Sequence, residues 1–156
     1  MKKGIKFISL LLITVLISGC ENNSDLKTTK CTLSKTNEDA LYNLKSEYVI
    51  YSNDGVVSKV ETTETVISTS GPILDYFESY LNNLYKTNNE TYGGYSNKIT
   101  KENDELISKT TINYEVMDTL KYSKDNPSFG SISNNNNQIT LEGIKSIYTS
   151  LGATCE

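Results

Sequence analysis

The sequence predicts an α+β fold: an antiparallel sheet of about four strands with two main helices packed on one face. Short runs of β-branched and aromatic residues, separated by turns rich in Asn, Asp and Gly, predict the strands. Two other segments, Pro72 to Lys86 and Leu141 to Leu151, place their apolar residues at helical spacing. The strands form two hairpin-like pairs along the chain, and each pair is followed by a helix.

Four segments are predicted as the main strands. The turn Asn53-Asp54-Gly55 separates the first two, because these residues tolerate a positive φ. Glu102-Asn103-Asp104 separates the last two. Cys31 to Ser34 either begins the first strand or precedes it as a shorter one. The four predicted strands are Lys45 to Tyr51, Val56 to Thr69, Thr91 to Thr100 and Leu106 to Val116.

Glu64 has two interpretations within the second of these strands. It shares the parity of the apolar residues Val60 and Val66, so an inward-facing carboxylate is one interpretation. A position at the rim of the sheet, or a β-bulge that changes the parity, is the interpretation that we favour.

Both helices carry signals at their ends. Ser70-Gly71-Pro72 begins the first helix, because proline loses nothing at the first helical position. Thr140 is expected to cap the second helix, and Gly152 is typical of the residue that follows a helix end. Three tyrosines of the first helix either bind a ligand or, as we favour, border its core-facing side. They are Tyr76, Tyr80 and Tyr85.

Residues 1–19 are predicted to be a lipoprotein signal peptide. A lysine-rich start precedes an apolar run from Phe7 to Ile17, which is shorter than the roughly 20 residues that a membrane-spanning helix needs. Leu16-Ile17-Ser18-Gly19-Cys20 then has the form of a lipobox, with small residues before a thiol that can form a thioether with diacylglycerol. The alternatives are an uncleaved anchor, which should be longer, and an ordinary signal peptide, which prefers an A-x-A site.

Lipid attachment on Cys20 would place the chain on the extracytoplasmic face of a bacterial cell membrane. The mature chain of 137 residues is then predicted to comprise a polar tether, residues 20–30, and one domain, residues 31–156. Its 12 lysines and 19 acidic residues give a formal charge of −7, without arginine or histidine. This charge argues against binding to nucleic acid or anionic headgroups, so we expect the acyl chains on Cys20 to provide the membrane attachment.

Two cysteines remain once Cys20 is assigned to lipid. An exported compartment permits disulfides, so the sequence favours a bridge between Cys31 and Cys155. This bridge would close a loop of more than 120 residues, which the chain-entropy model values at about 4–5 kcal/mol. Two free thiols are the alternative, although the chain has no histidine that could activate them.

Five short motifs follow the lipobox along the chain. They are Tyr-x-Ile-Tyr at 48–51, Gly-Val-Val-Ser-Lys-Val-Glu at 55–61, Tyr-Gly-Gly-Tyr at 92–95, Thr-Ile-Asn-Tyr at 111–114 and Ile-Thr-Leu-Glu-Gly-Ile-Lys at 139–145. Together with the lipobox, they resemble the YehR-like small bacterial lipoproteins, a family with a domain of unknown function. The resemblance covers essentially the whole mature domain. It implies a small α+β lipoprotein of the cell envelope without an established biochemical role, and it supplies no site residues.

The sequence contains no recognisable catalytic or metal-binding motif. Without histidine there is no Ser-His-Asp arrangement, and no calcium-loop pattern is present. We therefore expect no cofactor, and a non-enzymatic module that contacts an envelope protein, a small ligand or the cell wall. The alternatives are a small solute-binding component of a transporter and a carboxylate-dependent hydrolase. The hydrolase would use Glu61 with Glu64, or Glu102, Asp104 and Glu105.

Overall fold

The computed structural model describes residues 26–37, 41–127 and 131–156, which form six strands and three helices. The sheet has the order β4-β5-β3-β2-β1-β6, and all neighbouring strands are antiparallel. The predicted α+β class and antiparallel sheet are confirmed, whereas the predicted count of about four strands is too low. In chain order the elements are β1 (Lys27–Asn37), β2 (Tyr42–Asn53), β3 (Val56–Ile67), α1 (Gly71–Tyr92), β4 (Tyr95–Glu102), β5 (Glu105–Asn113), α2 (Thr119–Asp125), α4 (Leu141–Ser150) and β6 (Thr154–Cys155).

The two additional strands lie at the β1 side of the sheet. β1 is a full strand that pairs with β2 from Lys27 to Asn37, so residues 27–30 are strand rather than the end of a polar tether. β6 has only two residues, and it pairs through Cys31–Cys155 and Thr32–Thr154. The predicted signal peptide, Cys20 and residues 20–25 of the predicted tether lie outside the described residues.

The helix α1 is longer than the sequence predicts. It continues past Lys86 to Tyr92, so Thr91 and Tyr92 end a helix rather than begin a strand. Gly94 has a φ of +78°, and a Cβ at this position would lie 2.6 Å from the carbonyl oxygen of Asn113. The Tyr-Gly-Gly-Tyr motif is therefore a tight connection from α1 to β4, and it packs closely against the end of β5.

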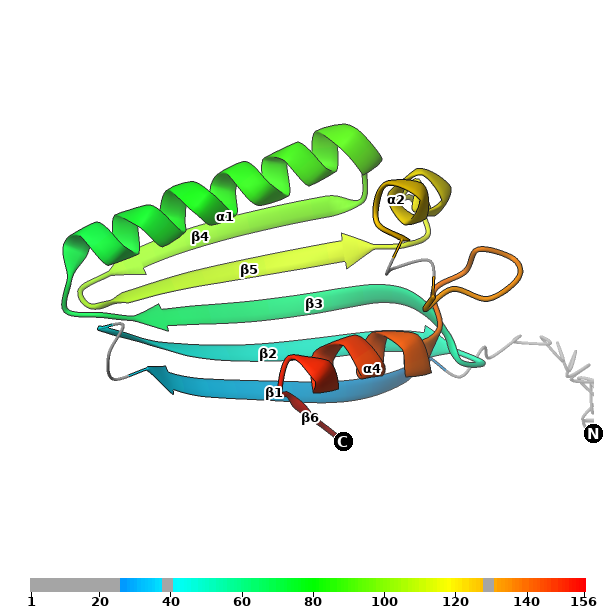
Figure 1. Ribbon diagram of the computed structural model, residues 1–156, viewed down its shortest axis with the longest axis horizontal. Coiled ribbons are helices and arrows are strands. Elements are labelled where there is room, and N and C mark those ends of the chain that lie inside the picture. The colour runs from blue at the N-terminus through cyan, green and yellow to red at the C-terminus, as the bar shows by residue number, and fades with distance from the viewer. Residues whose placement is uncertain (1–25, 38–40, 128–130) are drawn as a thin grey trace, which may run out of the picture.

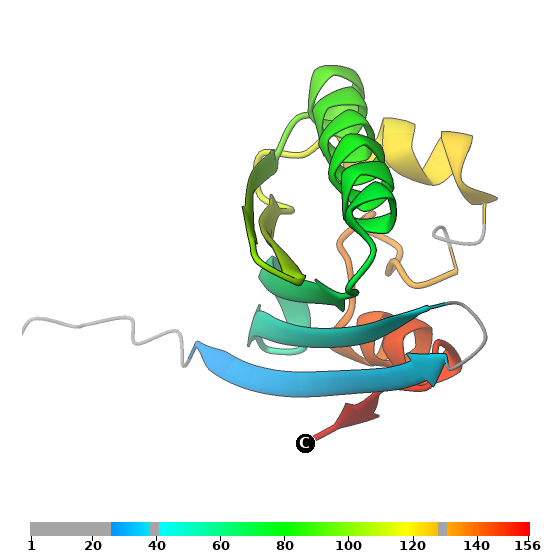
Figure 2. The same ribbon diagram turned by 90° about the vertical axis from the view of Figure 1, so that its left-hand side faces the viewer.

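The helices cover one face of the sheet. Figure 1 shows α1 along β4 and β5, α4 along β1 and β2, and α2 at the end where α1 stops. In Figure 2 the sheet bends between the β4–β5 pair and the β1–β2 pair, and the helices lie on the inside of the bend. No helix among the described residues is long and apolar enough to cross a membrane.

Two apolar clusters fill the space between the helices and the sheet. The cluster under α4 includes Ile50 and Ile144, and the cluster under α1 includes Leu74 and Leu106. Four polar residues on β3 and β5 lie between the two clusters, and we call them the polar row: Thr62, Glu64, Ser108 and Thr110. The hydroxyls of Ser108 and Thr110 both donate to Asn97 Oδ1.

Candidate functional site

One candidate site is a cavity of about 520 Å³ at one end of the sheet. Its size is within the range of small-molecule sites, roughly 300–1,000 Å³. We call it the end cavity, and three parts of the chain that are distant in sequence contribute to it, within residues 53–58, 114–119 and 136–139. Its lining residues are Asn53, Asp54, Val56, Val57, Ser58, Tyr114, Glu115, Thr119, Asn136, Asn137, Gln138 and Ile139.

The β2–β3 hairpin forms one wall and part of the floor of the end cavity. The Val57 N–H donates to the carbonyl of Ile139 at 2.8 Å, and the Leu141 N–H donates to the carbonyl of Gly55 at 2.8 Å. These bonds fix the hairpin tip against the segment that leads into α4. Val57 and Ile139 are almost fully buried, so the floor is apolar.

The asparagine-rich segment before α4 forms the second wall. Asn134 organises it, because its Oδ1 accepts the backbone N–H groups of Asn136 at 2.9 Å and Gln138 at 3.1 Å. Its Nδ2 donates to the Gln138 side chain at 3.0 Å. The Thr119 hydroxyl donates to the carbonyl of Asn137 at 3.2 Å, which ties the segment to α2. The polar segment therefore has a defined path along the cavity.

The third wall follows the end of β5. The Tyr114 N–H donates to the carbonyl of Ser58 at 2.9 Å, and the Glu115 N–H donates to Asn113 Oδ1 at 3.0 Å. Asp54 and Glu115 are the charged residues among the lining set. Neither forms a salt bridge within the described part of the chain. The end cavity therefore combines two carboxylates with carboxamides and hydroxyls above an apolar floor.

Glu64 faces inward, so the favoured interpretation of a rim position or a bulge is wrong. β3 pairs with β2 and β5 without a register shift between Val60 and Val66. The Tyr85 hydroxyl of α1 donates to Glu64 Oε2 at 2.9 Å. Burial raises the pKa of the Glu64 carboxyl, and this hydrogen bond partly opposes the shift. Burial likewise raises the pKa of Tyr85.

Glu61 lies on the opposite, open face of the sheet. It accepts hydrogen bonds from Lys59 Nζ and the Tyr51 hydroxyl, each at 2.8 Å. These two donors lower the pKa of the Glu61 carboxyl. Glu61 and Glu64, the first pair considered for the alternative hydrolase, are therefore not a catalytic pair, because two carboxyls on opposite faces cannot flank one scissile bond.

The remaining acidic candidates lie at the end of the sheet away from the end cavity. Glu102 and Glu105 face each other across the β4–β5 turn, and the Asp104 carbonyl accepts the Ser68 N–H at 2.9 Å. All three side chains are exposed. No group of three or more acidic or cysteine residues in the described part of the chain is arranged to hold a metal ion.

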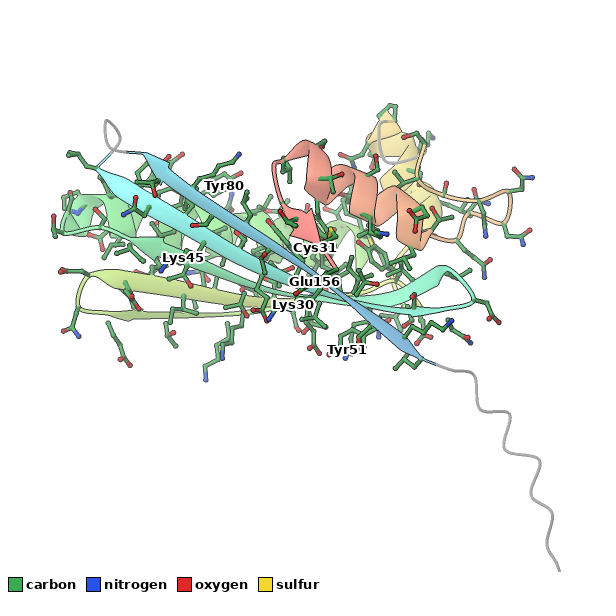
Figure 3. The ribbon with its side chains drawn as sticks, turned by 90° about the horizontal axis from the view of Figure 1, so that it is seen from below. Lys30, Cys31, Lys45, Tyr51, Tyr80 and Glu156 are labelled. Carbon is green, nitrogen blue, oxygen red and sulfur yellow. A yellow bond between two sulfur atoms is a disulfide. The ribbon has the colours of Figure 1, made fainter. Side chains whose placement is uncertain are left out.

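A disulfide joins Cys31 to Cys155, the pair that the sequence predicts. Figure 3 shows Cys31 near Glu156, where β6 lies against β1. Backbone hydrogen bonds in both directions between Lys30 and Glu156, at 3.0 and 2.9 Å, extend this pairing by one residue. Cys31 is fully buried in the cluster under α4. The bridge therefore fixes β6 against β1 at the edge of the sheet.

The tyrosines of α1 divide into two groups. Tyr85 packs in the cluster under α1, as a core-bordering residue should. Tyr76 and Tyr80 are exposed, at 64% and 50%, and their nearly parallel rings lie 6.2 Å apart. In Figure 3, Tyr80 lies on the helix-covered side of the sheet. This exposed pair is a second surface that is available for contacts.

The architecture defines a class of protein: small α+β domains with helices on one face of an antiparallel sheet. Within this class, the chain is similar in structure to Escherichia coli YehR, with a TM-score of 0.50, 13% identity, and coverage of 84% of this chain and 92% of YehR. It is also similar to a protein from Streptococcus pneumoniae TIGR4, with a TM-score of 0.51, 16% identity, and coverage of 100% and 99%. No family model and no curated protein matches the sequence. The predicted resemblance to YehR is therefore confirmed for the fold.

Proposed function

We propose that the chain is a lipid-anchored lipoprotein of the bacterial cell envelope, whose domain is a non-enzymatic binding module. The observation that carries this proposal is the lipobox that ends in Cys20, directly after an apolar run of signal-peptide length. The YehR-like fold supports the proposal, because it agrees with the family resemblance that the lipobox and the other sequence motifs indicate. The end cavity supports the binding role, because it is the size of a ligand site.

The position of β1 determines which end of the domain would lie near the membrane. Lys27 pairs with Ser52, and the next residues, Asn53 and Asp54, line the end cavity. Seven residue steps separate Cys20 from Lys27, which limits their separation to about 25 Å. In Figure 1 the chain enters the sheet at the end that carries the β2–β3 turn. Under this proposal, the end cavity is at the tethered end of the domain.

Replacing Cys20 with alanine tests the anchor directly. Cys20→Ala removes the thiol that would take the diacylglyceryl group, so we expect unprocessed precursor and loss of lipid labelling. The measurement is phase partitioning in a cloud-point detergent, combined with the size of the chain by mass spectrometry. Mature-sized Cys20→Ala protein in the detergent phase would contradict the proposal.

A double variant provides the matched control. Cys20→Ala with Ser24→Cys restores a cysteine four residues downstream, outside the lipobox. It should behave as Cys20→Ala does, whereas Ser24→Cys alone should be lipidated normally. Restoration of lipid labelling by the downstream cysteine would show that the lipobox does not direct the modification.

A further inference from the structure

We infer that the end cavity binds a ligand that carries both an ammonium group and hydroxyl groups, which is the chemistry of an amino sugar. The inference deepens the proposed binding function, because it names the class of ligand. It does not depend on the lipid on Cys20, since every residue that it uses belongs to the folded domain.

The charge of the lining residues determines which ligand charge the cavity favours. Asp54 and Glu115 line the cavity from two different walls, and no lysine is among the lining residues. Neither carboxylate has a salt-bridge partner among the described residues. An anionic ligand would be repelled here, whereas an ammonium group would form charge-assisted hydrogen bonds with the carboxylates.

The neutral lining groups indicate what else the ligand carries. Carboxamides and hydroxyls both donate and accept hydrogen bonds, and they therefore match the hydroxyl groups of a sugar, which do the same. Val56, a partly exposed lining residue, offers an apolar surface for the C–H groups of a pyranose ring. These neutral polar residues are Asn53, Ser58, Thr119, Asn136, Asn137 and Gln138.

The walls of the cavity are held in place without a ligand. The hairpin tip is bonded to the segment before α4, Asn134 organises the second wall, and Thr119 connects that wall to α2. Backbone groups that are already fixed lose little entropy when a ligand binds. The donors and acceptors of the cavity are therefore preorganised for a polar ligand.

The test is a binding titration of the full mature protein in detergent micelles. The probe is a β-1,4-linked glucosamine trimer, measured by isothermal calorimetry at low ionic strength. The matched control ligand is the N-acetylated trimer, which keeps the hydroxyls but lacks the positive charge. We expect the N-acetylated trimer to bind at least about tenfold more weakly, because it cannot pair with the two carboxylates.

Two substitutions assign the binding to the end cavity. Asp54→Asn and Glu115→Gln each remove one carboxylate and keep the shape of the side chain. Each should therefore lower the affinity for the glucosamine trimer by about tenfold or more. Asp104→Asn is the control, because Asp104 lies in the β4–β5 turn at the other end of the sheet. It should bind the trimer as the wild-type protein does. Thermal unfolding of all three variants verifies that they are folded.

Four results would overturn the inference. Equal affinity for the charged and N-acetylated trimers would show that the ammonium group is not recognised. Binding that survives both substitutions, or no binding at all, would remove the end cavity as the site. Calcium binding that both substitutions abolish, without trimer binding, would reassign the site to a cation. Each of these outcomes leaves the Cys20 anchor to be judged by its own labelling experiment.

Discussion

Two glutamates three positions apart on β3 lie on opposite faces of the sheet. Glu61 is partly exposed on the open face and lies beside Lys59, and the hydrogen bond from Lys59 lowers the pKa of its carboxyl. Glu64 lies on the covered face with Tyr85 as its donor, and burial raises its pKa above the ordinary value of 4.5. Because the folded state binds a proton at Glu64 more tightly than the unfolded state does, Glu64 favours folding below its ordinary pKa. This contribution is lost as the pH rises through the raised value.

Glu64→Gln should therefore stabilise the protein at neutral pH. The amide accepts the Tyr85 hydrogen bond but does not place a charge between the two apolar clusters. We expect an increase in the free energy of unfolding on the order of 1 kcal/mol at pH 7, which disappears at pH 4. Urea unfolding followed by circular dichroism across this pH range measures the difference.

Glu61→Gln is the control with the opposite sign. It removes a carboxylate whose lowered pKa favours folding above its ordinary value, so any effect should be a loss that fades as the pH falls. The effect should be small, because exposed ion pairs are screened by solvent. If Glu64→Gln lowers stability at pH 7, the carboxylate is better satisfied than its burial indicates.

The helix α4 is attached to the domain through close contacts at both ends. The Thr140 side chain accepts the Gly143 N–H at 3.2 Å, as the sequence predicts, and its hydroxyl donates to the Ile132 carbonyl at 2.7 Å. Farther along, Tyr148 stacks on Tyr48 of β2, with ring centroids 3.9 Å apart. The first turn of α4 therefore determines where the wall of the end cavity meets the sheet.

Gly143→Ala tests how closely this first turn packs. Alanine normally stabilises a helix relative to glycine by about 1 kcal/mol, but a Cβ at Gly143 would lie 2.4 Å from the Cβ of Ile132. We expect a net loss of about 1–3 kcal/mol in thermal or urea unfolding. Gly71→Ala at the start of α1 is the control, because no atom lies within 4 Å of its Cβ position. Equal effects of the two substitutions would show that Ile132 does not limit α4.

The exposed edge strand β4 is tied to α1 by charge. Lys101 lies on the covered side of β4 and forms salt bridges with Asp75 at 2.6 Å and Glu78 at 2.7 Å. Lys98, on the same strand, lies opposite Lys109 of β5. Lysines on an edge strand disfavour pairing with a strand of another molecule. The arrangement therefore stabilises the place of α1 and also protects the free edge.

At the scale of the whole molecule, the disulfide connects the two ends of the folded domain. Cys31 and Cys155 are separated by 124 positions, and the bridge adds a covalent bond to the short pairing between β6 and β1. In the chain-entropy model, a crosslink of this span limits the unfolded chain much more than it changes the folded one.

The double variant Cys31→Ala with Cys155→Ala should lose about 4–5 kcal/mol in the free energy of unfolding. Urea denaturation measures this loss, and the reduced wild-type protein should resemble the variant. Thiol alkylation of the non-reduced protein is the independent control, and it should label neither cysteine. Labelling of both cysteines, or a variant as stable as the wild type, would contradict the structural role of the bridge.

Local patterns in the sequence predict the parts of the fold that depend on local physics. Alternation along β3, the helical stripe after Pro72 and the cap at Thr140 each reflect neighbouring residues, and all three appear in the structure. β6 escapes prediction, because two residues are too few to show a period. The parity of Glu64 agrees with its inward position, but the donor that satisfies its carboxylate, Tyr85, comes from a different element and could not be read from local patterns.

The end cavity could not be predicted, because its walls meet only in three dimensions. Asn53-Asp54-Gly55 carries the signal of a turn, and the run of asparagines at 134–137 is by itself only a polar stretch. Each has an adequate local explanation. The bonds from Val57 to Ile139 and from Leu141 to Gly55, which join residues far apart in sequence, bring the two segments together around one space.

The place of Cys31 near the start of β1 also has a mechanical consequence. A force applied through the N-terminal segment would first separate Lys27 to Lys30 from β2, one hydrogen-bonded rung at a time. It would then meet a covalent bond at Cys31, which passes the load through Cys155 to the buried Ala153 and to α4. For a protein held by that segment, peeling would stop after four residues, and the sheet that carries the end cavity would resist shear as one body.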